Sequence, residues 1–223
     1  ALTTLPYYIF GYSFIDSFFD TMSLLTTTGT TTLPGSVNVI SWHIWRALLS
    51  WIGGIGIVFI AFYGLLNANV FSSKKMIKAE GRDKMNASYK DTITTLWIIY
   101  IVLTIVGILL LLLCGMDLLN SITYTASAIS TTGHDMPNNN YIFNSNIQLV
   151  IAFIILLGCT SFVTHYSAYK QKNPLAYFKE PQFISMLLMI VVCFLVFYLS
   201  IHSTYTWQSI LGLIVGAMGG GFI

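Results

Sequence analysis

The stretch "SLLTTTGTTT", residues 23–32, places small hydroxylated side chains around one glycine inside an otherwise apolar chain. The stretch "SAISTTGHD", residues 127–135, repeats this pattern, so that Gly29 and Gly133 lie 104 residues apart. The longer segments "SFIDSFFDTMSLLTTTG" and "DLLNSITYTASAISTTG", which end at these two glycines, align along their whole length. Self-similarity at a fixed spacing indicates an internal repeat, and its unit ends in Thr-Thr-Gly.

Composition assigns the chain to the membrane proteins. Of its 223 residues, 56% are hydrophobic and 8% are charged, whereas a soluble domain carries about 25% charged residues. The net charge of +2 rests on few ionised groups, and we predict no nucleic-acid partner. The cysteines Cys114, Cys159 and Cys193 lie far apart in apolar runs. Their odd number and spacing argue against a disulfide framework or a Cys-x-x-Cys metal site.

Hydrophobic runs predict an all-α membrane protein made of repeated units. Four runs approach or reach the about 20 residues that a helix needs to cross a bilayer. Three others have about 12 residues, which as helix would cross about half of it. Because each short run leads into small residues, we expect units of span, re-entrant pore helix, filter loop and span. The expected long spans are 44–66, 96–114, 147–166 and 183–201, and the expected pore helices are 14–25, 118–129 and 207–218.

The basic residues predict the orientation of the chain. Nine of the ten Lys and Arg residues lie in two loops, at 67–91 and 168–182. The positive-inside rule makes both loops cytoplasmic. We therefore expect a multi-pass protein of the plasma membrane whose filter loops open to the outside. Arg46 is the one base on the opposite side, and we expect it to snorkel or to bind pore-helix carbonyls.

These features divide the chain into five segments. Residues 1–66 form a first pore-loop repeat without its outer helix, and residues 67–91 form a basic cytoplasmic loop. Residues 92–167 form the second repeat, and residues 168–182 form another cytoplasmic loop. Residues 183–223 begin a third repeat, with its outer helix, its pore helix and a filter at the end.

A re-entrant helix that ends in Thr-Thr-Gly suits a cation. Non-helical backbone at membrane depth is tolerated only where protein buries it or where it lines a water-filled cavity. The carboxyl end of a helix is the negative end of its dipole, and glycine allows the torsions that aim carbonyls at one axis. Rings of backbone carbonyls replace the hydration shell of K⁺ in potassium channels. The alternative is a Thr-rich turn at the membrane surface, but two loops at matching places favour a filter.

Several motifs in order resemble the Trk/Ktr family of potassium transporters, and in particular its TrkH-type membrane subunit. They are "LTTTGTT", "WRALLSWIGGIGIVFIA", "KAEGRDKM", "LWIIY", "STTGHD" and "CTSFVTHYSAY", and together they cover nearly the whole chain. The resemblance implies potassium uptake through a carbonyl-lined selectivity filter, with potassium as the transported substrate and no organic cofactor. It also implies a homodimer in the lipid bilayer that binds a cytoplasmic ring of nucleotide-binding regulatory subunits.

The resemblance also assigns the filter residues, which would act mainly through main-chain carbonyls. No metal site is expected beyond this potassium filter. The residues are Thr27, Thr28 and Gly29 in the first repeat, Thr131, Thr132 and Gly133 in the second, and Gly219, Gly220 and Gly221 in the third.

The chain departs from the family pattern of four repeats, since only three pore loops are present. We expect a fragment or a truncated copy, and the alternative function is that of a truncated, non-conducting paralogue acting as an assembly or regulatory membrane subunit. An enzyme is not expected, because the sequence has no paired intramembrane carboxylates and no Ser-His-Asp order.

Three charged or titratable positions near the expected outer face leave two interpretations open. His134, which follows the second filter glycine, would face the outer mouth or lie at a solvated loop end. Asp16 and Asp20 lie four residues apart, where they would raise the local cation concentration or cap and solvate the start of the pore helix. Gly53, Gly54 and Gly56 lie inside a span and are expected to permit close helix packing.

Overall fold

The computed structural model describes residues 2–33, 40–67, 89–133, 144–171 and 173–200. Every regular element within these ranges is a helix, which confirms the all-α expectation. The elements are η1 (Leu2–Thr4), α1 (Leu5–Ile9), α2 (Phe14–Leu25), α3 (Ile40–Asn67), α5 (Tyr89–Leu113), α6 (Leu118–Ile129), α7 (Ser145–Cys159), α8 (Phe162–Gln171), η4 (Pro174–Lys179) and α9 (Pro181–Ser200).

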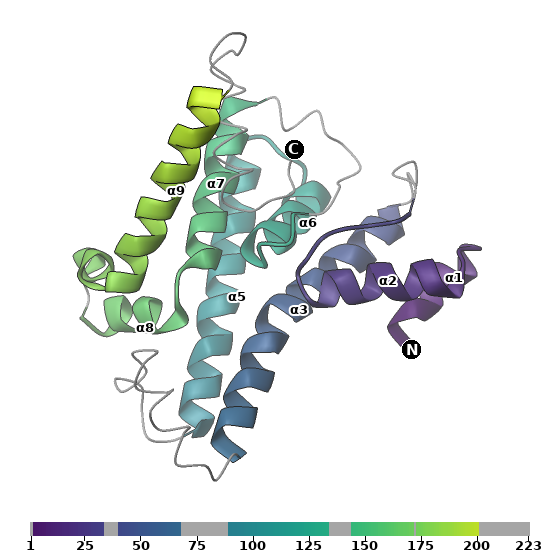
Figure 1. Ribbon diagram of the computed structural model, residues 1–223, viewed down its shortest axis with the longest axis horizontal. Helices are drawn as coiled ribbons and strands as arrows, with labels where there is room; N and C mark the ends of the chain where they lie inside the picture. Colours follow the sequence, from purple (N-terminus) through teal and green to yellow (C-terminus); the bar gives the residue numbers. More distant parts are fainter. Residues whose placement is uncertain (1, 34–39, 68–88, 134–143, 172, 201–223) are drawn as a thin grey trace.

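The long helix α5 forms the centre of the described part of the chain (Figure 1). Helices α6 and α7 pack against it, and α6 also packs against α3 and α7. Helix α2 lies across α3, away from α7 and α9, and its other neighbours are the short η1 and α1 (Figure 1). The first short helix is therefore held mainly by one long helix, and the second by three.

The short helices α2 and α6 begin and end at positions 104 residues apart, and both have 12 residues, as the two alignable sequence segments predict. Each begins at a side-chain cap, which satisfies one of the helix's first amide groups. Ser13 accepts from the Asp16 amide before α2, and Asp117 accepts from the Asn120 amide before α6. Two of the three expected short helices are thus confirmed as helices, and 207–218 lies outside the described residues.

The third expected span is not one helix, so the prediction of a continuous helix over 147–166 is wrong. Helix α7 ends at Cys159, Thr160 has extended backbone torsions, and α8 begins at Phe162. The Thr160 hydroxyl donates to the Leu156 carbonyl at 2.7 Å, a local bond that competes with the regular helical ladder. Across the break, Nε2 of His165 lies 3.0 Å from the Leu157 carbonyl oxygen and joins α8 to the end of α7.

One helix among the described residues is long and apolar enough to cross a bilayer on length and composition, Thr94–Leu113 within α5. Beyond Thr94, its exposed side chains are apolar, including Ile98, Val102 and Leu109. A row of exposed apolar side chains of this kind suits a lipid-facing surface. Ser145–Cys159 and Pro181–Val192 are apolar helices of shorter length.

Glycines bring the long helices onto the ends of the short ones at equivalent places in the two repeats. A Cβ at Gly53 would meet the backbone of Leu25, the last residue of α2. A Cβ at Gly158 would meet the backbone of Ile129, the last residue of α6. Close packing is thus confirmed for Gly53, and Gly54 lies similarly close to Ser130. The prediction of close packing is wrong for Gly56, because no atom of the described residues lies within 4 Å of a Cβ added there.

Replacing Gly53 with alanine should therefore destabilise the protein. The added methyl would push on the backbone of Leu25, and overpacking of this kind costs about 1–3 kcal/mol. Thermal unfolding of the detergent-solubilised full-length protein measures the change. Gly56→Ala, on the same helix but with open space, is the matched control and should leave stability unchanged or slightly raised. Equal losses in both variants would contradict the packing account.

Candidate functional site

The two Thr-Thr-Gly loops begin with the same hydrogen-bonded helix ending. After α2, the Thr27 amide donates to the Leu24 carbonyl at 3.1 Å and the Thr28 amide to the Ser23 carbonyl at 2.8 Å. After α6, the corresponding bonds from Thr131 and Thr132 measure 3.1 and 3.0 Å. Two bonds of this kind define a Schellman ending, which satisfies carbonyls that the helix leaves unpaired.

A threonine takes the left-handed place that glycine usually occupies in such an ending. Thr27 and Thr131 both have φ of 56°, and they are the non-glycine residues with positive φ in the described part of the chain. A left-handed conformation costs an L-residue about 1–2 kcal/mol. Strain of this kind persists only where the surroundings hold it, and it is frequent at functional sites. Glycine follows two residues later in each loop, with φ of 78° at Gly29 and 64° at Gly133.

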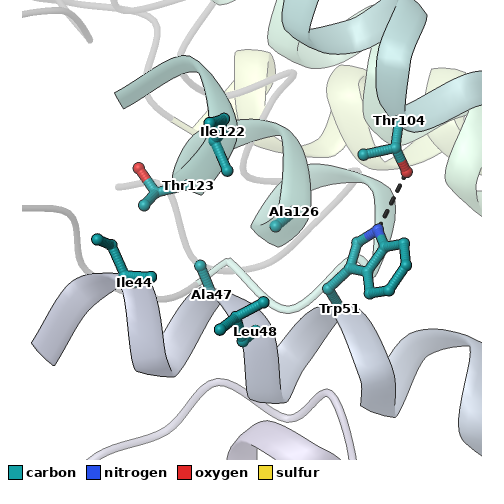
Figure 2. A pocket seen from close by; sticks show the side chains of 8 residues that line it. All are labelled: Ile44, Ala47, Leu48, Trp51, Thr104, Ile122, Thr123 and Ala126. Carbon is teal, nitrogen blue, oxygen red and sulfur yellow. Dashed lines mark hydrogen bonds between the residues drawn. The ribbon is translucent and has the colours of Figure 1, made fainter. Parts of the chain in front are cut away.

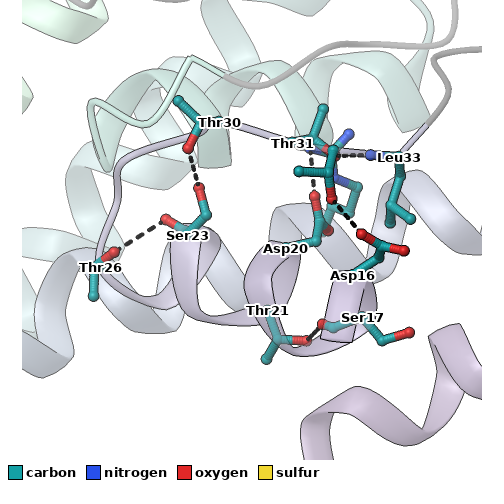
Figure 3. Close-up of polar contacts among 11 residues, drawn as sticks. Asp16, Ser17, Asp20, Thr21, Ser23, Thr26, Thr30, Thr31 and Leu33 are labelled. Carbon is teal, nitrogen blue, oxygen red and sulfur yellow. Dashed lines mark hydrogen bonds and ion pairs between the residues drawn. The ribbon is translucent and has the colours of Figure 1, made fainter. Parts of the chain in front are cut away.

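Hydroxyl groups around the turn bond mainly to the helix end or to each other. The hydroxyls of Thr26 and Thr28 lie 3.0 Å apart, and that of Thr26 donates to the Met22 carbonyl at 2.8 Å. At the equivalent place in the second repeat, the hydroxyls of Ser130 and Thr132 lie 2.7 Å apart. The side chains thereby stabilise the backbone path of each loop, and Figure 3 shows Ser23 with Thr26 and Thr30 at the first loop.

The two loops touch each other although 104 residues separate them in sequence. A Cβ added at Gly29 would collide with the main-chain carbonyl oxygen of Thr132. The contact also involves the Thr132 side chain, whose Cγ2 would lie 3.3 Å from that Cβ. The structure thus brings together the first predicted loop, Thr27–Thr28–Gly29, and the second, Thr131–Thr132–Gly133.

The loops differ in burial. Thr132 is 1% exposed and Gly133 is buried, whereas Thr26 and Thr28 are exposed and Gly29 is half-buried. The second loop is therefore more deeply buried than the first. The predicted third loop, Gly219–Gly220–Gly221, and His134 lie outside the described residues.

A buried ion pair lies beside the first loop, and it corrects the expectation for Arg46. The Arg46 guanidinium on α3 lies 3.3 Å from Oδ1 of Asp20 on α2, with side-chain exposures of 4% and 0%. Arg46 therefore does not snorkel, because its side chain is buried. In the described part of the chain, its hydrogen-bond partner is the Asp20 carboxylate and not a main-chain carbonyl. Nor is Asp20 an exposed attractor of cations, because the carboxylate is fully enclosed.

Asp16, one turn before Asp20, has a structural role at the start of α2. Its amide donates to the Ser13 hydroxyl, and Oδ1 accepts from the Thr32 hydroxyl at 3.2 Å (Figure 3). Asp16 therefore ties the segment that leaves the first loop back to the helix that enters it, in agreement with the capping interpretation.

A cavity of about 220 Å³ lies between α3, α5 and α6 (Figure 2). Trp51 closes one side, where its indole donates to the Thr104 hydroxyl at 3.0 Å. The cavity is lined by Ile44, Ala47, Leu48, Trp51, Thr104, Ile122, Thr123 and Ala126. This apolar lining lacks the charged or carbonyl-rich surface that a cation requires. Within the residues that the structure describes, no group of three His, Cys, Asp or Glu side chains lies together as a metal site.

Sequence reasoning missed several residues at the two ends of the short helices. Gly11 and Gly115, with φ of 86° and 88°, turn the chain before each short helix, and Ser23 and Ser127 supply the carbonyls that hold each loop. The repeat alignment already pairs Ser23 with Ser127 at the spacing of 104. Extending the alignment two residues toward the N-terminus would also have paired Gly11 with Gly115.

Residues 4–217 match the family model of TrkH, described as a cation transport protein. An uncharacterized cation transporter of Methanocaldococcus jannaschii is 30% identical over 210 residues, which is 93% of this chain and 43% of the relative. The Trk system potassium uptake protein TrkH of Escherichia coli is 29% identical over 204 residues, 86% of this chain and 41% of its own length. The protein of the same name from Vibrio parahaemolyticus is 30% identical over 207 residues, with coverages of 87% and 42%.

The chain spans about two fifths of the length of the curated relatives that it matches, between 41% and 43% for these three. The match nevertheless includes both loops, α2, α6 and the long helices around them.

Relieving the strained torsion at Thr27 should stabilise the protein. Thr27→Gly removes the left-handed penalty, so we expect the free energy of unfolding to rise by about 1 kcal/mol. Thr26→Gly is the matched control, because Thr26 has a negative φ of −88° and its hydroxyl bonds to the helix. That control should lower stability, as measured by thermal unfolding in detergent. A loss of stability in Thr27→Gly as large as in Thr26→Gly would contradict the strain assignment.

Proposed function

The chain belongs to the TrkH family of cation transport proteins, and on that premise we propose that its protein takes up potassium across a membrane. The proposed path runs past the main-chain carbonyls of the two Thr-Thr-Gly loops. The relatives from E. coli and V. parahaemolyticus are named Trk system potassium uptake proteins, which supports potassium as the substrate.

The contact between Gly29 and the Thr132 carbonyl is the observation that carries the proposal. It supports a common axis for the two loops. The helices before the loops have the same length, and Thr27 and Thr131 have the same φ. Both helices direct their carboxyl ends, the negative ends of their dipoles, into these loops. Carbonyl oxygens gathered around one axis replace the hydration shell of a potassium ion.

The proposed filter comprises Thr27, Thr28 and Gly29 with Thr131, Thr132 and Gly133. Gly219, Gly220 and Gly221 are proposed as the corresponding part of a third repeat, from the sequence alone. Because the loops act through the main chain, their function depends on torsions and on close approach more than on side-chain chemistry.

The proposed orientation follows from the charges. The loops at 67–91 and 168–182 carry most of the basic residues and would lie in the cytoplasm, with the filter loops open to the outside of the plasma membrane. Exposed Lys170 and Lys179, at the ends of α8 and η4, agree with a polar boundary on that side.

The proposed partners are a second copy of the protein and a nucleotide-binding regulatory subunit in the cytoplasm, alongside the lipid bilayer. Both proteins are proposed from the family resemblance. By its charge, the basic segment within 67–91 would lie on the proposed cytoplasmic side and contact the regulatory subunit or anionic lipid.

Gly29→Ala should impair potassium transport, because its methyl would displace the Thr132 carbonyl as well as strain its own torsion. We expect radioactive rubidium uptake by the reconstituted full-length protein to fall roughly tenfold, which corresponds to about 1.4 kcal/mol. The ratio of potassium to sodium uptake should fall as well.

Gly11→Ala is the matched control for this experiment. Gly11 has a similar positive φ of 86°, but an added Cβ has nothing of the described structure within 4 Å. Uptake should therefore stay near the unaltered rate. Unchanged uptake and selectivity in Gly29→Ala would contradict the filter assignment and favour a non-conducting assembly or regulatory subunit.

A further inference from the structure

The buried face of α2 is unusual for a helix that packs in an apolar protein. Its buried residues are Ser17, Asp20, Thr21, Ser23 and Leu24, of which only Leu24 is apolar. Its large apolar side chains lie on the exposed side instead: Phe14, Ile15, Phe18, Phe19 and Met22. Apolar packing of α2 against α3 is therefore confined to the last turn of α2, where Leu24 and Leu25 join a cluster with Trp42 and Leu49.

Two of the buried polar side chains bond within their own helix. The Ser17 hydroxyl donates to the Ser13 carbonyl, and the Thr21 hydroxyl donates to the Ser17 carbonyl, both at 2.7 Å. Asp20 is different, because Oδ1 reaches across to the Arg46 guanidinium on α3 at 3.3 Å. Separating these two groups would leave a buried charge without its partner, which is costly, so the contact restricts how α2 can slide or rotate on α3.

The first loop is attached one turn further along the same face, at Ser23. The Ser23 carbonyl accepts from the Thr28 amide at 2.8 Å, and the Ser23 hydroxyl lies 3.1 Å from that of Thr30. Residues three apart lie on one side of a helix. A displacement of α2 at Asp20 is therefore passed directly to the backbone of the first loop.

The second repeat holds its short helix by a different means. Tyr124 takes the place of Asp20 on α6. Counted back seven residues from Gly158, as Arg46 is from Gly53, Ile151 takes the place of Arg46 on α7. Both Tyr124 and Ile151 are buried in the apolar core. Helix α6 also packs against α3, α5 and α7. The charged contact is thus a feature of the first repeat, where the short helix has fewer long helices around it.

We propose that Asp20 and Arg46 form a positioning pair for cation selectivity, which sets where α2 presents the first loop to the second. The inference rests on the proposed function, since it concerns the selectivity of that same path. Neither side chain touches the ion. Both act through Ser23 and the contact of Gly29 with the Thr132 carbonyl.

The test measures the ratio of potassium to sodium uptake by the full-length protein in liposomes. Asp20→Asn and Arg46→Gln each leave one buried charge unpaired, and we expect each to lower the ratio by about three- to tenfold. The double variant Asp20→Asn/Arg46→Gln removes both charges and should recover much of the ratio, since the two effects are coupled.

Two further variants keep the test decisive if a single charge variant fails to fold. Asp20→Glu retains the charge but is one methylene longer, so it should fold and still alter the ratio. Thr21→Val, at the next buried residue, changes a bond that remains inside α2, and it should leave the ratio unchanged.

The outcomes separate this inference from the proposed function. An unchanged ratio in Asp20→Asn, Arg46→Gln and Asp20→Glu, together with a lowered ratio in Gly29→Ala, would overturn the positioning role and leave the filter intact. A double variant whose ratio is as low as in the single charge variants would contradict the coupling of the two residues. An unchanged ratio in all of these variants would overturn both. Lower protein amounts with an unaltered ratio would make the pair a stability element only and would also overturn the inference.

Discussion

The last carbonyls of a helix have no partner inside the helix, and the rest of this structure depends on how the two short helices satisfy them. The Ser23 and Ser127 carbonyls accept from the Thr28 and Thr132 amides. These bonds force one residue of each loop into the left-handed region. The loop can then leave the helix end at a sharp angle, and the helix dipole ends beside it.

Close approach is the second consequence of this arrangement. Gly53 and Gly158 let the long helices reach the last turn of each short helix, and Gly29 lets the two loops meet. The two repeats share this backbone geometry but not the side chains that support it. Repeat two relies on an apolar core around Tyr124, whereas repeat one combines a smaller apolar cluster around Leu24 with the Asp20–Arg46 pair.

The sequence predicted the helical class, the bounds of α2 and α6 and the spacing between them, because hydrophobic run length and the repeat alignment report these directly. It did not predict the break after Cys159, because the apolar run does not report the local change of backbone torsion at Thr160. Nor did it predict the partner of Arg46, because a contact across 26 residues depends on how two helices cross. The sequence also did not predict the left-handed torsion at Thr27, because threonine avoids that region unless tertiary structure enforces it.

A structure of the full-length protein with thallium or rubidium in place of potassium tests the central claim most directly. The account predicts anomalous scattering from an ion between the two Thr-Thr-Gly loops, with main-chain carbonyl oxygens of Thr27, Thr28, Thr131 and Thr132 as its nearest protein atoms. An ion bound by side-chain carboxylates elsewhere, with none at these loops in protein that transports rubidium, would contradict it.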